Sequence, residues 1–210
     1  MTKSNIYVAL LADVVGSRRL PPAPRAALQH DLRAALPQAN RRWRRALAAR
    51  FALARGDEIE GLLRDPGAVW DIAHWLRARL PQVDWIIACG RGPIATALAP
   101  SALEVDGPCF HLARTALEAA KRDRRLFAFA GFGGHVDALA RYYSALYWSW
   151  TPRQRRAANQ LRAAAGAPLE QTGERLHVHP TAVSHMKRRL AWPLVAAGDT
   201  LFQATLQETT

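Results

Sequence analysis

Apolar residues gather in five short runs along the first 130 residues, and each run has the length of a β-strand. The predicted strands are 6–12, 49–54, 59–63, 83–89 and 126–130. Between them, apolar residues recur at helical spacing, as in Val69, Ile72, Ala73 and Leu76. The predicted helices are 24–47, with a break at Pro37, 67–80 and 108–121.

The two strands that flank Gly56 and Asp57 are close enough in sequence to form a hairpin. A strand, a helical connection, a hairpin, a helix and a further strand predict an α+β fold. We expect a ferredoxin-like sandwich with helices on one face of a mostly antiparallel sheet.

The chain changes character near Trp150, after which only helical patterns follow. Thr151 is a suitable N-cap and Pro152 a suitable first helical residue. Helices are predicted at 168–176 and 180–190, separated by the three-residue turn 177–179, which is the layout of a helix-turn-helix. The sequence therefore predicts two domains, an α+β domain at 1–150 and an all-α helix-turn-helix domain at 151–210.

The last of these helices has two distinct faces. Val183, Met186 and Leu190 recur at i, i+3 and i+7 and are expected in the core. The opposite face has side chains that can reach base edges, namely Thr181, Ser184, His185 and Arg188, and flanking cations expected on phosphates, namely Lys187 and Arg189. The alternative is a small helical bundle with a solvated basic face.

An aromatic stripe precedes the change in character, formed by Tyr143, Tyr147 and Trp150. We expect it to be buried where the two domains meet, and a base-stacking platform is the alternative.

The composition favours a polyanionic partner, because 29 Lys and Arg residues face 17 Asp and Glu residues, a formal net charge of +12. The apolar run 6–15 is too short for a membrane span and contains Asp13, so a cytoplasmic protein without membrane contact is expected. Cys89 and Cys109 lack the spacing of a disulfide framework or zinc site and are expected as small buried residues.

Two carboxylates follow strand-like runs, Asp13 after 7–12 and Asp57 in the hairpin. Carboxylates at the edge of a sheet commonly hold a divalent metal and a phosphate. The alternative is that each is an ordinary turn or cap residue.

Segments 10–17, 55–58, 89–94 and 106–114 resemble, in this order, those of class III nucleotide cyclases. Together with the helix-turn-helix they are similar to the SatD family of bacterial proteins, over essentially the whole chain. The C-terminal helices also resemble sigma-factor region 4, on the residues Val178, Pro180, Val183, Ser184 and Lys187. In that pattern a glycine usually stands where this chain has His177, which would need a positive φ or a changed turn.

The cyclase resemblance implies that Asp13 and Asp57 bind Mg²⁺ with a purine nucleotide. It implies a phosphate cradle at Val14, Val15, Gly16 and Ser17, and a ligand contact at Arg114. Read from the residues alone, Arg114 is a surface arginine or a partner of Glu118.

Two positions depart from the cyclase pattern. Phe110 stands where an asparagine is expected, and Leu53 where a purine-selecting lysine is expected. Without these two groups, the positioning of a nucleotide substrate and the electrostatic stabilisation of its transition state are incomplete. This favours a regulator over an enzyme.

We therefore expect a DNA-binding transcriptional regulator whose first domain senses a ligand or mediates pairing, acting as a homodimer on double-stranded DNA. The alternative is a metal-dependent nucleotide cyclase, or another enzyme that processes a nucleotide signal.

Overall fold

The computed structural model describes residues 5–208 and is built around a five-stranded sheet in the order β2-β3-β1-β4-β5. The strands are β1 (Tyr7–Val14), β2 (Leu47–Arg55), β3 (Glu58–Leu63), β4 (Trp85–Gly92) and β5 (Phe127–Ala130). All neighbours pair antiparallel except β4 and β5, which are parallel. The predicted α+β class, hairpin and mostly antiparallel sheet are confirmed.

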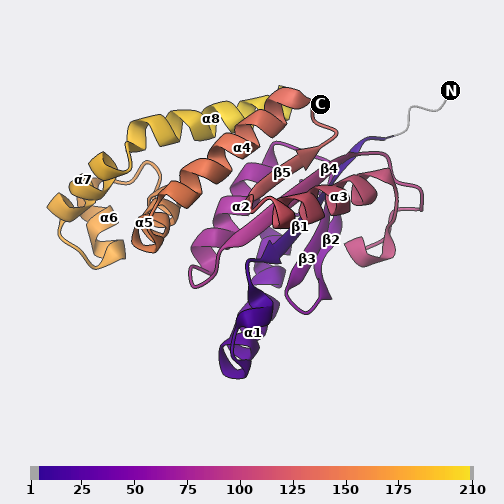
Figure 1. The fold of residues 1–210 in the computed structure, drawn as a ribbon, viewed down its shortest axis with the longest axis horizontal. Coiled ribbons are helices and arrows are strands. Elements are labelled where there is room, and N and C mark those ends of the chain that lie inside the picture. Colours follow the sequence, from indigo (N-terminus) through magenta and orange to yellow (C-terminus); the bar gives the residue numbers. More distant parts are fainter. Residues whose placement is uncertain (1–4, 209–210) are drawn as a thin grey trace.

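Helices cover both faces of this sheet (Figure 1). Val8, Leu10 and Ala12 of β1 belong to the larger core, which contains residues of α1 (Pro22–Arg42), α2 (Ala68–Arg79) and α4 (Gly134–Ser149). The alternate residues of β1 pack in a second core with α3 (Pro108–Arg122). The prediction of helices on one face was wrong, because β1 is apolar at successive positions and both of its faces must be buried.

Helix α1 differs from the predicted helix 24–47 in two ways, in its continuity at Pro37 and in where it ends. It runs through Pro37 without a break and ends at Arg42, so that Leu47 begins β2. Proline removes one helical hydrogen bond, but five residues of α1 are buried and tertiary packing outweighs that loss. The buried residues are Leu28, Leu32, Ala35, Leu36 and Ala39.

The C-terminal region is helical as predicted, with α5 (Pro152–Ala163), α6 (Leu169–Leu176), α7 (Pro180–Arg189) and α8 (Trp192–Glu208). Thr151 caps α5 in a capping box with Gln154. In Figure 1 these helices lie beside the sheet, and α8 returns from α7 toward it. α5 packs on α2, while α8 contacts α2, α4 and α7. The division into domains at 1–150 and 151–210 stays a prediction.

A buried network of aromatic and polar side chains joins the C-terminal helices to α2 and α4. The aromatic stripe is buried there as predicted, with Tyr143, Tyr147 and Trp150 all in the larger core. The Tyr147 hydroxyl donates to Asn159 at 2.9 Å, and Arg162 on α5 pairs with Asp199 on α8 at 2.7 Å. These contacts bind α5 and α8 to the same core as the sheet.

Two short 3₁₀ helices complete the chain, η1 (Ser17–Arg19) and η2 (Ala102–Glu104). Cys89 and Cys109 are free and buried, as predicted, and burial raises the pKa of Cys109 to about 11. Among the described residues, no helix combines the length and apolar character that crossing a membrane requires.

Candidate functional site

The first candidate site is an acidic edge of the sheet, where β1 ends beside the β2–β3 hairpin. Ala12 pairs with Ile59, so Asp13 follows on β1 close to the start of β3 and to Asp57 in the turn. Burial raises the pKa of Asp13, and the charges of Asp57 and Glu58 raise it further. Lys121 on α3 acts in the opposite direction, with its Nζ 3.4 Å from the Asp13 carboxylate. The fold therefore brings Asp13 and Asp57 close enough for the charge of Asp57 to raise the pKa of Asp13.

Arg114 lies on the same side of the sheet but points to two other carboxylates. Its guanidinium donates to Glu58 Oε1 and to Glu60 Oε1, each at 2.5 Å. Glu58 is buried, and burial raises the pKa of Glu60 although the charge of Arg114 lowers it. Arg114 therefore pairs with β3 rather than with Glu118, which lies 3.5 Å from Lys121 instead.

The two carboxylates at this edge provide only part of a metal site, and Mg²⁺ binding at Asp13 and Asp57 stays a prediction. Oδ2 of Asp57 is buried and has no hydrogen-bond partner among the described residues. Asp13, however, already has a cation beside it, and no group of three or more His, Cys, Asp or Glu side chains in the described part of the chain is placed to hold a metal ion. Mg²⁺ prefers near-octahedral oxygen coordination, which two carboxylates beside a lysine provide poorly.

The predicted phosphate cradle spans the last residue of β1 and the tight turn that follows it. Val14 is buried and Val15 is exposed, and the amide of Val15 donates to the carbonyl of Asp84 at 2.9 Å. Gly16 has φ +70, and Ser17 begins η1, where its carbonyl accepts from Arg25. Part of the expected cradle is thus engaged within the protein, and a phosphate contact at these four residues stays a prediction.

Three partners in this arrangement were not singled out from the sequence, namely Glu58, Glu60 and Lys121. Glu58 and Glu60 alternate along an otherwise apolar strand, which places both on the α3 side. Arg114 and Lys121 are seven residues apart on α3 and share a helical face. Two acidic residues spaced two apart on a strand, and two basic residues spaced seven apart on a helix, are the sequence signals for the contact between β3 and α3.

The second candidate site is the exposed face of α7. Val183 and Leu190 are buried and Met186 packs partly buried against the core, as the spacing predicted. Most of the predicted DNA-contacting side chains are exposed, while Lys187 is half-buried; the exposed ones are Thr181, Ser184, His185, Arg188 and Arg189. The Arg188 guanidinium lies 2.6 Å from Nδ1 of His185, and the His179 ring caps α7 by accepting from the Thr181 amide.

The turn between α6 and α7 has an unusual backbone. His177 adopts φ 52 in the left-handed region, so the positive φ expected from the missing glycine is present. The chain then passes close to α6, and a Cβ added at Gly173 would lie 2.7 Å from the carbonyl oxygen of Val178. A glycine in α6 and a strained histidine in the turn together allow α7 to pack at this angle.

Comparison with known proteins finds a matching family model and similar solved structures. A family model described as the SatD family matches residues 7–125, which span β1 to α3 and end before β5. A solved structure of a bacterial light-regulated adenylyl cyclase is similar at 14% identity and a TM-score of 0.45, covering 59% of this chain and 74% of that chain. No curated protein matches the sequence significantly.

Proposed function

This chain belongs to the SatD family, and we propose that it is a DNA-binding transcriptional regulator. Its α+β part senses a ligand or mediates pairing, and its C-terminal helices contact double-stranded DNA. The observation that carries the proposal is the face of α7, which is exposed, polar and basic while its opposite face is buried. A helix presented in this way after a short turn is the element that enters the major groove in helix-turn-helix proteins.

The net charge of +12 supports the same partner, because cations on a protein replace the counterions of DNA. Within α7 the cations have different roles. Arg188 is exposed on the base-reading face, whereas Lys187 is half-buried at its flank. Bidentate arginine contacts read guanine, and lysine contacts to phosphate carry no sequence information.

Selection of bound duplexes from random DNA, followed by anisotropy titrations of single variants, tests the proposal. Arg188→Ala is expected to cost about 1–3 kcal/mol on the selected sequence and to relax base preference. Lys187→Ala is expected to weaken selected and random duplexes alike and to reduce the salt slope by about one. Arg33→Ala, an exposed arginine on α1, is the control for general charge.

If both α7 variants bind selected and random duplexes as the parent does, α7 is structural and the regulator role fails. Circular dichroism on each variant excludes unfolding as the cause of any loss.

Binding or processing of a nucleotide signal by residues 7–125, which match the SatD family model, is the second candidate function. The unpartnered Oδ2 of Asp57 favours it, whereas the engagement of Arg114 and Lys121 with carboxylates opposes it. A thermal shift with ATP or GTP and Mg²⁺ that Asp57→Asn abolishes would support this candidate, because a ligand of the folded state stabilises it. Conversion of labelled ATP or GTP that depends on Asp13 and Asp57 would establish an enzyme.

A further inference from the structure

Four arginines surround a buried tryptophan where α1 meets β2, in the segment 41–45, which we name the arginine turn. Trp43 is 9% exposed and packs edge-to-face on Trp75, with ring centroids 5.4 Å apart. Its carbonyl oxygen accepts the amides of Ala46 and Leu47 at 2.9 and 3.0 Å. Because Trp43 is anchored in the core, the turn is fixed and its arginines are held at the surface.

No counterion for these arginines lies among residues 5–208. In the part of the chain that the structure describes, the guanidinium groups of Arg41, Arg42, Arg44 and Arg45 form no ion pair and no hydrogen bond, and Arg42 only lies over the Trp43 ring. The dipole of α1 favours cations in its last turn, but Arg44 and Arg45 lie beyond the helix. An anion bound beside so dense a group of like charges would reduce their mutual repulsion.

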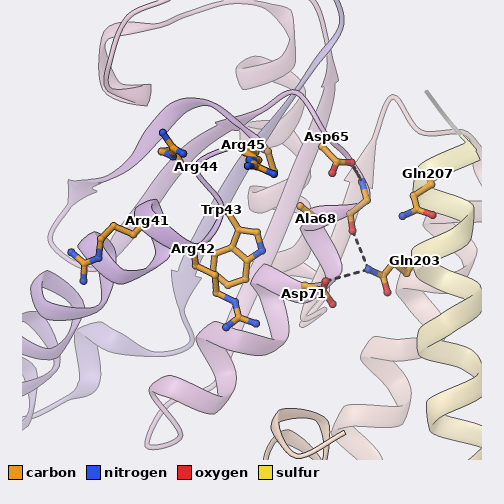
Figure 2. Close-up of a pocket in the computed structure, with 12 residues that line it drawn as sticks. Arg41, Arg42, Trp43, Arg44, Arg45, Asp65, Ala68, Asp71, Gln203 and Gln207 are labelled. Atoms are coloured by element: carbon orange, nitrogen blue, oxygen red, sulfur yellow. Dashed lines mark hydrogen bonds between the residues drawn. The ribbon is translucent and has the colours of Figure 1, made fainter. Parts of the chain in front are cut away.

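The arginine turn forms one wall of a cavity of about 570 Å³ (Figure 2). The other wall has acidic and amide side chains, among them Asp65 before α2, Asp71 in its first turn and Gln203 on α8. Asp65 accepts the Gly67 amide at 2.9 Å, and Asp71 accepts from Gln203 at 3.2 Å. The cavity has the volume of a small-molecule site, and its two walls have opposite chemistry.

Each wall favours a different part of a ligand. A guanidinium group matches a phosphate with two parallel hydrogen bonds, whereas carboxylates accept hydrogen bonds from hydroxyl or amino groups. A nucleic-acid backbone would bring its negative charges toward Asp65 and Asp71 as well as toward the arginines. The opposed walls therefore favour a molecule with phosphate at one end only.

We propose that this cavity binds a small phosphorylated molecule with hydroxyl or amino groups away from the phosphate, of the nucleotide or sugar-phosphate class. Arg44 and Arg45 hold the phosphate, and Asp71 accepts from the distal groups. The site is separate from the acidic edge of the sheet and from α7. It does not depend on DNA binding.

Calorimetric titration of the full chain tests this site, with ADP and inorganic pyrophosphate as probes, no DNA, and EDTA to exclude divalent cations. We expect saturable binding at one site per chain. The double variant Arg44→Ala/Arg45→Ala should weaken both probes by about tenfold or more, because each lost guanidinium removes charged hydrogen bonds. Asp71→Asn should weaken ADP but not pyrophosphate.

The matched control is Arg33→Ala/Arg79→Ala, which removes the same charge from exposed arginines on α1 and α2. Equal weakening in both double variants would reduce the effect to general attraction, and no saturation by either probe would refute the site. A third outcome is that the parent binds a random duplex but not ADP, and that only the Arg44/Arg45 variant loses the duplex. The arginine turn would then be a nucleic-acid surface and the proposal would be wrong. Equal loss of both probes in Asp71→Asn would overturn the assignment of the second wall. Loss of DNA binding through α7 would change none of these outcomes.

Discussion

Arg114 neutralises two carboxylates that the sheet places under α3. Glu58 and Glu60 project from the same side of β3, and their side chains are only 7% and 13% exposed. Removing one partner of a buried ion pair leaves an uncompensated charge, which costs more than the pair contributed. The stability of the folded sheet therefore depends on Arg114.

We expect Arg114→Ala to lower the free energy of unfolding by about 2 kcal/mol at pH 7, less than for a fully buried pair because Arg114 is 40% exposed. The pKa of Glu60 is raised in the folded state, so as the pH falls Glu60 is protonated in the folded protein at a higher pH than in the unfolded chain. Acidification from pH 7 to about 5 should thus reduce the deficit of the variant. Urea unfolding at both pH values measures the difference in unfolding free energy between Arg114→Ala and the parent.

Arg122→Ala is the control, because its pair with Asp123 on the surface of the same helix contributes little. A deficit in Arg114→Ala that grows toward pH 5 would contradict the explanation.

His74 is a buried residue at the junction of α2 with the C-terminal helices. Its ring stacks on Tyr147, its Nδ1 lies 3.3 Å from the Tyr147 hydroxyl, and its Nε2 has no partner. Burial, together with the charges of Arg162 and Arg77, lowers the pKa of His74 well below 6.5. The folded protein therefore keeps this ring neutral.

Because the unfolded chain takes up a proton at His74 below pH 6.5 and the folded protein does not, stability should fall as the pH drops from 6.5 toward 5. The slope for one proton approaches about 1.4 kcal/mol per pH unit. His74→Gln should flatten the dependence, while the exposed His30→Gln should retain it. An unchanged slope in His74→Gln, measured by urea unfolding across this range, would exclude His74 as its source.

At the scale of elements, the predicted three-residue turn between α6 and α7 is present and contains a strained residue. His177 has φ 52, a region where glycine is free of steric cost and most other residues are not. The turn is nevertheless formed, because Val183 and Leu190 bury α7 against the core. Packing thus offsets a local penalty.

His177→Gly should relieve this penalty and stabilise the protein by about 0.5–1 kcal/mol, after allowing for the extra freedom of glycine in the unfolded chain. Arg175→Gly, in α6 and exposed, should instead cost about 1 kcal/mol because it lowers helix propensity. Chemical denaturation compares the two. Equal destabilisation by both substitutions would show that the histidine side chain itself supports the turn.

For the whole molecule, we expect a homodimer. A helix-turn-helix reads a palindromic site best as a pair, with half-sites one helical turn or a multiple apart. Light scattering at micromolar protein should give twice the chain mass of 23.2 kDa. Inserting about five base pairs between the half-sites should weaken binding, and about ten should restore part of it.

A monomer mass both with and without DNA would contradict this prediction. A duplex with one half-site is the matched control, since it should bind more weakly than the full site whichever spacing is used.

The sequence by itself determined the five strands, the positions of α2, α3, α6 and α7 and the Thr151 cap, because apolar periodicity and capping act within short windows. Only the tertiary structure decided that helices cover both faces of the sheet and that α1 continues through Pro37, since burial outweighs local propensity. It also decided the partners of Arg114. Glu58 lies 56 positions away from Arg114, and the strand register and the position of α3 on the sheet, rather than local spacing, bring the two side chains together.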